Sequence, residues 1–268
     1  CDIYLSGNTD ITLSGLNEKV FDTSVQSTAT YDWDFRVDSS TSVTDSVGGL
    51  SATFVNGMTS TIANGAYLDN NGTEFIELDD FEFGSVCSFE VYFKLESTQD
   101  GNGIVNFMHP GTSFGDATDI VTIYQGASTF HNFVKNNGSN TGVWGNNDMG
   151  AYNTNWNHVI WTFNNSTHIQ YLNGVEVLNR TDVPLRTFTR ATHRLGNTLG
   201  YSCMHGYFKY FRVWQGTALT QSDVTTFYNN REVTSPPVGT KTLTASDNTL
   251  TLAKLKEEII LKSNTFTI

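Results

Sequence analysis

Hydrophobic and polar residues alternate with a period of two along much of this chain, and turn-forming residues interrupt the alternation. The clearest alternating runs are WNHVIWTF at 156–163, IQYLNGVEV at 169–177 and GYFKYFRVW at 206–214. A period of two sends successive side chains to opposite faces of a strand, so these runs predict strands. Long stretches with helical periodicity are nearly absent, and the pattern therefore favours an all-β protein.

Turn and cap residues between these runs sharpen the prediction. Asn173-Gly174 separates two apolar runs and favours a type I′ hairpin, in which both central residues need a positive φ. Gly216 ends the aromatic run, and residues 220–223 (TQSD) supply side chains that commonly cap a helix. We expect a hairpin, a long aromatic strand and a short helix that ends near Tyr228, in that order.

The same segment resembles a known family in several short motifs. These are W-x-H-V at 156–159, Y-x-N-G at 171–174, G-Y-F-x-x-F-R-V at 206–213 and A-L-T at 218–220. Upstream matches are YDWDF at 31–35, TDSVGG at 44–49, AYLD at 66–69, FIEL at 75–78 and CSFEVYF at 87–93. Together they resemble the laminin-G-like jelly roll of the concanavalin A-like lectin/glucanase superfamily. The resemblance implies a two-sheet antiparallel β-sandwich with jelly-roll topology over roughly residues 31–232.

Two terminal extensions flank this predicted jelly roll. Residues 1–30 alternate weakly, and residues 233–268 begin with a linker that contains paired prolines. Both extensions contain strand-like runs, so they either clamp onto the sandwich or pair with the sheet edges of neighbouring chains. The run TLAKLKEEIIL at 251–261 fits both a helix and a strand. Because the chain starts at Cys1, we expect a processed product or a piece of a longer protein.

The net charge of −12 narrows the classes of partner. Nucleic-acid backbones and anionic membrane surfaces attract clustered Lys and Arg, whereas this chain has 15 basic and 27 acidic residues. The chain also lacks an apolar run of about 18 residues, so we expect no membrane insertion. We expect no nucleic-acid partner either. The acidic surface favours solubility, and divalent-cation binding is the alternative.

Three cysteines cannot all form internal disulfides. Cys87 opens one predicted core strand and Cys203 precedes another. If these strands lie antiparallel and adjacent, the two side chains lie at opposite ends, which argues against a bridge. We therefore expect Cys87 and Cys203 to be free thiols.

Three carboxylates form an E-x-D-x-x-E pattern at Glu77, Asp79 and Glu82. Laminarinase-type glucanases of the resembled superfamily carry this pattern on one sheet face, and retaining hydrolysis needs two carboxyls about 5 Å apart. Here the pattern spans the end of a predicted strand and an acidic turn, and no Trp lies between Trp33 and Trp144. We expect no catalysis, and hydrolysis by these three residues is the alternative.

Polar and aromatic residues between 131 and 156 form the candidate carbohydrate site. Sugars stack their CH groups on aromatic rings, while amides and carboxylates hydrogen-bond their hydroxyls. Trp144 lies among turn residues and suits this role, although it also fits a core-facing strand. The candidate contacts are Trp144, Tyr152, Asn146, Asn147, Asp148 and His131. Trp156, His158 and Trp161 lie in strands that resemble the family core, and we interpret them as structural.

A calcium ion is the one cofactor that the resemblance implies. Many laminin-G-like domains hold calcium at a loop rim, and this cation takes carboxylate and carbonyl oxygens. Asp116 and Asp119 lie in a predicted loop and are the candidate ligands, with a plain turn role as the alternative. His and Cys residues show no zinc-site spacing, so we expect no other metal.

We expect a non-catalytic, lectin-like module used for glycan binding, adhesion or assembly. Its predicted partners are glycans or polysaccharides, and neighbouring protein chains through the terminal extensions. The run FRVWQGTALTQSDV at 211–224 resembles large multidomain proteins of marine algae and of their large DNA viruses. That resemblance implies an extracellular or virion-surface location. A structural assembly protein without a ligand is the alternative.

Overall fold

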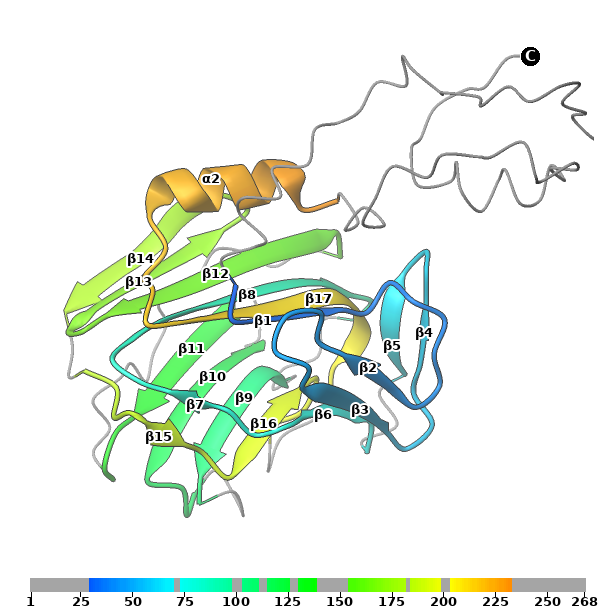
Figure 1. Cartoon of the computed structure of the whole chain (residues 1–268), viewed down its shortest axis with the longest axis horizontal. Coiled ribbons are helices and arrows are strands. Elements are labelled where there is room, and N and C mark those ends of the chain that lie inside the picture. The colour runs from blue at the N-terminus through cyan, green and yellow to red at the C-terminus, as the bar shows by residue number, and fades with distance from the viewer. Residues whose placement is uncertain are drawn as a thin grey trace, which may run out of the picture. The chain divides into compact units, whose positions relative to one another are not determined.

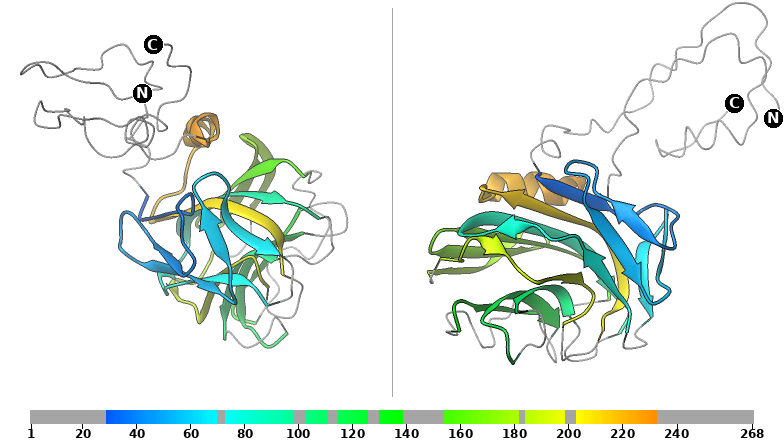
Figure 2. Two further views of the ribbon diagram at one scale, coloured as in Figure 1. Left: turned by 90° about the vertical axis from the view of Figure 1, so that its right-hand side faces the viewer. Right: turned by 60° about the horizontal axis from the view of Figure 1, so that its bottom comes forward.

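Within the residues that the structure describes, the chain folds into two large antiparallel sheets and one short helix, arranged as in Figures 1 and 2. The computed structural model describes residues 29–69, 73–97, 103–110, 115–125, 130–138, 154–181, 184–198 and 203–232. Their strands and helix belong to one compact unit, Ser24–Arg231. The predicted fold, a two-sheet antiparallel β-sandwich of the jelly-roll type, is confirmed.

The larger sheet has eight strands within the described ranges. Seven of them follow the order β14-β13-β12-β8-β17-β5-β4, and β1 also pairs with β17. Their bounds are β1 (Tyr31–Asp34), β4 (Thr59–Thr61), β5 (Gly65–Asp69), β8 (Val86–Leu95), β12 (Trp156–Asn164), β13 (Thr167–Leu172), β14 (Val175–Thr181) and β17 (His205–Gln215). The long strands β8 and β17 pair with each other at the centre of this order. Strand β8 is also hydrogen-bonded to β12, and β17 to β5.

The smaller sheet follows the order β11-β10-β9-β16-β6-β3-β2. Its strands are β2 (Ser42–Thr44), β3 (Ser51–Val55), β6 (Phe75–Leu78), β9 (Gly103–His109), β10 (Asp119–Gln125), β11 (Phe130–Lys135) and β16 (Thr192–Leu195). A separate two-stranded ribbon joins β7 (Glu82–Phe83) and β15 (Phe188–Thr189). Sequence-distant strands therefore lie side by side, as jelly-roll connections require.

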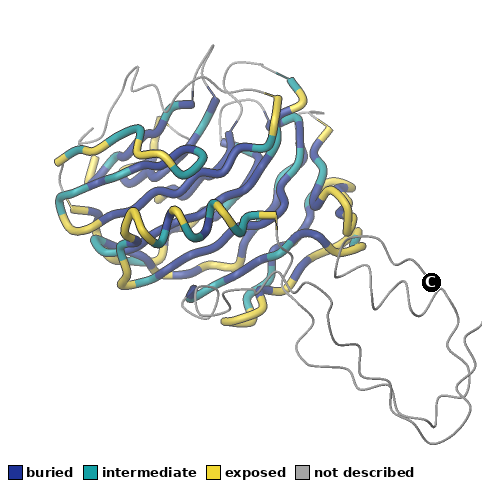
Figure 3. The backbone as a smooth tube through the Cα atoms, turned by 90° about the horizontal axis from the view of Figure 1, so that it is seen from above, coloured by how far each residue is buried: buried dark blue, intermediate teal, exposed yellow. Residues whose placement is uncertain are grey.

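The main hydrophobic core lies between the inner faces of the two sheets. Strand β8 contributes Phe89, Val91 and Phe93, and β12 contributes Val159 and Trp161, all of which are buried. Figure 3 shows the buried backbone running along the strands and the exposed residues gathered in turns and on the helix. Apolar burial of this kind supplies most of the folding free energy.

Local turn chemistry forms the hairpin and the helix as predicted. Asn173 and Gly174 have φ angles of 52° and 83° and connect β13 to β14. Thr220 and Asp223 make a capping box at the start of helix α2 (Gln221–Asn230). The helix buries its apolar residues against Trp214 and other side chains on the face of the larger sheet that points away from the core.

The two described cysteines are buried, free thiols, as predicted. Cys87 pairs in register with Gln215 at one end of β17, whereas Cys203 precedes the other end of that strand. Burial raises the pKa of the Cys87 thiol to about 12. This thiol is therefore unreactive at neutral pH.

Residues 1–28 and 233–268, which hold the predicted terminal extensions, lie outside the described residues. Pairing of these extensions with neighbouring chains stays a prediction. In the described part of the chain, no helix is long and apolar enough to cross a membrane.

Candidate functional site

The larger sheet has an outer face, which points away from the core. On β8 the core-facing residues are odd-numbered, so Ser88, Glu90, Tyr92 and Lys94 lie on the outer face. Helix α2 packs over part of this face through a second apolar cluster that includes Ile160 of β12. The outer face therefore has a covered part and a part beyond the helix.

Four outer-face residues align across four neighbouring strands. The register places Tyr207 of β17 opposite Tyr67 of β5 and also opposite Lys94 of β8. Lys94 in turn lies opposite Trp156 of β12. We call Tyr67, Tyr207, Lys94 and Trp156 the outer row. All four are partly exposed, whereas Tyr92, the preceding outer-face residue of β8, is buried.

The three aromatic rings of the outer row lie close together. The ring centroids of Tyr67 and Tyr207 are 4.7 Å apart, and those of Tyr207 and Trp156 are 6.3 Å apart. Two ammonium groups accompany them, with Lys209 Nζ 4.2 Å from the Trp156 centroid and Lys94 Nζ 5.7 Å from the Tyr207 centroid. The result is a continuous aromatic surface that cation–π contacts hold in place.

Polar groups line one side of the outer row and centre on Glu96, which follows β8. The Glu96 carboxylate lies 3.8 Å from Lys94 Nζ and 3.6 Å from His205 Nε2. The Tyr67 hydroxyl lies 3.2 Å from the same His205 nitrogen. Partial burial, and then the charge of Glu96, raises the pKa of both Tyr67 and Tyr207. Both phenols therefore stay protonated at neutral pH and can donate hydrogen bonds.

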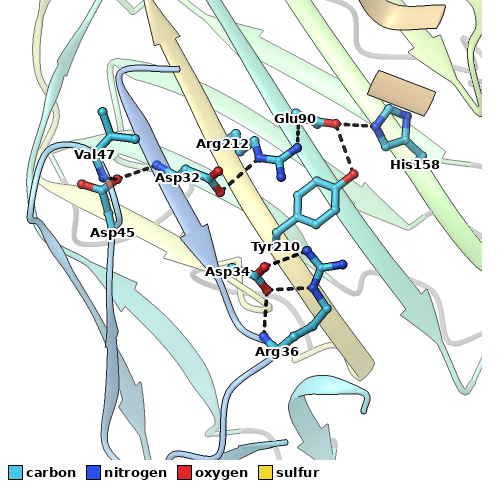
Figure 4. A network of polar contacts seen from close by, with 9 residues as sticks. All are labelled: Asp32, Asp34, Arg36, Asp45, Val47, Glu90, His158, Tyr210 and Arg212. Atoms are coloured by element: carbon cyan, nitrogen blue, oxygen red, sulfur yellow. Dashed lines mark hydrogen bonds and ion pairs between the residues drawn. The ribbon is translucent and has the colours of Figure 1, made fainter. Parts of the chain in front are cut away.

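A fully buried polar network occupies the same face beside the outer row, as Figure 4 shows. Glu90 Oε1 accepts a hydrogen bond from the Tyr210 hydroxyl (3.2 Å) and lies 2.6 Å from His158 Nε2. Arg212 Nη1 donates to Glu90 Oε2 at 3.1 Å, and Arg212 Nε lies 3.0 Å from Asp32 Oδ1. We call Asp32, Glu90, His158, Tyr210 and Arg212 the buried network.

Charges in the buried network fix the protonation states of its members. Burial alone would raise the pKa of Glu90, but Arg212 and His158 outweigh it and lower the pKa. Burial would likewise lower the pKa of Arg212, but Asp32 and Glu90 raise it. For Asp32, burial outweighs Arg212, and the pKa is raised. Since all these groups are sealed from solvent, the network supports the sheet and cannot contact a ligand.

The structure describes one of the six residues predicted to bind carbohydrate. His131 lies on β11 of the smaller sheet, where its ring stacks on Tyr124 at a centroid distance of 5.3 Å. It therefore lies on a different sheet from the outer row. The other five lie outside the described residues, and their role stays a prediction: Trp144, Asn146, Asn147, Asp148 and Tyr152.

The sequence predicts structural roles for Trp156, Trp161 and His158, and the structure separates Trp156 from the other two. Trp161 is buried in the core, and His158 is a buried, hydrogen-bonded member of the network. Trp156 is partly exposed on the outer face. Alternate residues of a strand face opposite ways, so Trp156 lies on the same face as His158, two positions on, and on the opposite face from Trp161, five positions on. Strand parity was thus the signal in the sequence that identifies Trp156.

The E-x-D-x-x-E carboxylates have separate partners. Glu77 on β6 receives a hydrogen bond from Arg194 Nε at 2.7 Å, and Asp79 accepts one from the Ser51 backbone N–H at 2.7 Å. Glu82 is exposed on β7, in the separate two-stranded ribbon. The pattern thus spans a strand end and a turn, as the sequence predicted, but Glu82 lies in a strand and not in the acidic turn where the sequence predicted it.

Asp119 does not fit a calcium site. Its buried carboxylate lies 3.1 Å from Arg186 Nη1 and accepts hydrogen bonds from the Thr118 hydroxyl and the Asn137 N–H. Donors therefore surround the oxygens that a cation would need. Asp116 is exposed. In the described ranges, no group of three or more His, Cys, Asp and Glu residues could hold a metal ion. Calcium binding stays a prediction that these residues do not support.

Sequence comparison identifies the family. A laminin G model described as "Concanavalin A-like lectin/glucanases superfamily" matches residues 69–225, more than half of the chain. The chain belongs to this superfamily. The matched range begins in β5 and ends within α2, so it contains every residue of the outer row except Tyr67. Among curated proteins, none matches this sequence.

Solved structures show the same fold at low sequence identity. Domain 4 of AbnA, a GH43 extracellular arabinanase from Geobacillus stearothermophilus solved with arabinotriose, has a TM-score of 0.56 and 19% identity. The match covers 74% of this chain and 96% of that domain. Trypanosoma rangeli sialidase has a TM-score of 0.55 and 9% identity over 77% of this chain. This chain spans about a third of the sialidase, since the match covers 33% of that protein.

Proposed function

We propose that this chain is a non-catalytic carbohydrate-binding module whose ligand stacks on the outer row. The partly exposed rings of Tyr67, Tyr207 and Trp156 carry this proposal, because aromatic faces bind the CH groups of sugars. Glu96, His205 and Lys94 lie beside the rings and can hydrogen-bond sugar hydroxyls.

Other observations support a binding role. The arabinanase domain with the same fold was solved with a bound trisaccharide. The separate partners of Glu77 and Asp79, and the position of Glu82 on a different ribbon, favour binding over hydrolysis, because retaining hydrolysis needs two carboxyls facing each other across one bond. A binding module also suits the extracellular or virion-surface setting that the sequence predicts.

Trp156→Ala tests the proposal in the intact chain. Affinity electrophoresis against soluble arabinan, β-glucans, mannans and uronic-acid polysaccharides should show retardation of the parent protein by at least one polymer. The variant should lose about tenfold in affinity, about 1.4 kcal/mol, because one stacking ring is removed.

Phe75→Ala is the matched control, since Phe75 is a partly exposed aromatic residue on β6 of the smaller sheet. It should bind as the parent does. Absence of retardation by every polymer, or equal losses in the two variants, would refute the proposed site. Hydrolysis of any polymer that Glu77→Gln abolishes would refute the non-catalytic role.

A further inference from the structure

The rings of the outer row are tilted relative to one another. The interplanar angle is 36° between Tyr67 and Tyr207, and 46° between Tyr207 and Trp156. A β-sheet twists by about 20–25° from each strand to the next, so side chains in one row turn progressively. Tyr207 and Trp156 lie two strands apart, on either side of Lys94. The aromatic surface therefore follows the twist of the sheet and is not flat.

The outer row is also longer than one sugar unit. It crosses four neighbouring strands, which lie about 4.8 Å apart, so its backbone positions span about 14 Å, and its terminal rings lie at most about 11 Å apart, long enough for roughly three sugar units. Successive rings are 4.7 Å and 6.3 Å apart. Each ring can thus stack on a different unit of one chain, whose axis runs across the strands.

The Tyr67 end of the row is open. The next position across the sheet is Thr59 of β4, which is opposite Tyr67, exposed and small. Thr154 and Asn155, which precede Trp156 along the chain, are also exposed. A glycan chain that lies on the rings can therefore continue past Tyr67, and the row can bind part of a longer polymer.

We infer that the outer row binds several consecutive units of a single, soluble and twisted glycan chain and rejects a flat crystalline polysaccharide surface. A flat surface could contact only one of the three tilted rings fully, whereas a twisted chain can present a sugar face to each. This inference rests on the proposed function and specifies its ligand class. Glu96 and His205 bind hydroxyls along one side of the chain.

A length series tests the inference in the full chain. Oligosaccharides of one to six units, prepared from the polymer that gives the strongest retardation, are titrated by calorimetry. Affinity should rise at least tenfold between one unit and about three units and then level off. Crystalline cellulose and crystalline chitin should not retain the protein in sedimentation assays.

Tyr67→Ala and Tyr67→Phe locate the ligand on the row. Tyr67→Ala should weaken binding of the longest oligosaccharide about tenfold but leave binding of the disaccharide within twofold, because the rings of Tyr207 and Trp156 remain. Tyr67→Phe keeps the ring and should bind nearly as the parent does. Thermal melting of each variant verifies its fold.

Three outcomes overturn the inference and leave the proposed function standing. One is equal affinity for a monosaccharide and for longer chains, and another is retention on a crystalline polymer through Trp156. The third is a loss on Tyr67→Ala that is the same at every length. Absence of binding to soluble and crystalline polymers alike overturns the proposed function together with the inference.

Discussion

The outer row and the buried network lie on the same face of the same strands but in opposite environments. Both use β8, β12 and β17. On β8, Tyr92 lies between Lys94 of the outer row and Glu90 of the network, and it is opposite His158 and Tyr210. The outer row is partly exposed and mixes aromatic rings with cations, whereas the network is sealed and mixes carboxylates with an arginine. The contrast shows that solvent access, and not residue type alone, separates the proposed binding surface from a structural element.

Removal of Glu90 should have the largest effect on stability. Glu90→Ala leaves Arg212, His158 and Tyr210 without their common acceptor in a sealed site. The free energy of unfolding should fall by about 3–5 kcal/mol, because a buried ion pair loses one partner and three buried donors lose their acceptor, although Asp32 still contacts Arg212. Urea unfolding followed by tryptophan fluorescence measures it. A loss below about 1 kcal/mol would show that the network contributes no more than a surface ion pair.

The pH dependence of stability should come partly from Glu90. Its folded pKa is lowered, so the unfolded state binds the proton first as the pH falls. The stability that Glu90 contributes is therefore present above its unfolded pKa of about 4.3 and is lost below it. Compared with Glu90→Gln, the parent should lose up to about 1.4 kcal/mol more per pH unit in that range.

His193 provides a common background for this comparison. Burial, and then Arg190, lowers the pKa of His193 to about 3. Below about pH 6.5 the unfolded state therefore binds a proton that the folded state does not bind, and the folded state loses stability. Both proteins keep His193, and the difference between their urea-unfolding curves isolates Glu90. Parallel pH profiles for the two proteins would contradict the role assigned to Glu90.

Substitution of Glu96 should have the smallest effect, and mainly on binding. Glu96→Gln should change the free energy of unfolding by less than about 0.5 kcal/mol, since its contacts to Lys94 and His205 are long and exposed. Polysaccharide affinity should fall about fivefold, because a charged acceptor for sugar hydroxyls is lost. A variant that loses more stability than affinity would place Glu96 with the structural residues.

Local sequence patterns determined the elements of this protein. Asn173-Gly174 specifies its hairpin because only a few residues accept two successive positive φ angles. Thr220 and Asp223 specify the helix start because their side chains satisfy backbone N–H groups that the helix leaves open. The motifs between 156 and 220 likewise identified the superfamily that the comparison then showed. All of these signals lie within a few residues of the structure they specify.

The tertiary structure alone decided which of these elements meet. The outer row joins residues 67, 94, 156 and 207, and its alignment depends on the register of strands that are far apart in the sequence. No local pattern encodes that register, because it is set by how both faces pack. Strand parity could exclude Trp156 from the core, but the partial exposure of its ring depends on which side chains of the neighbouring strands lie beside it.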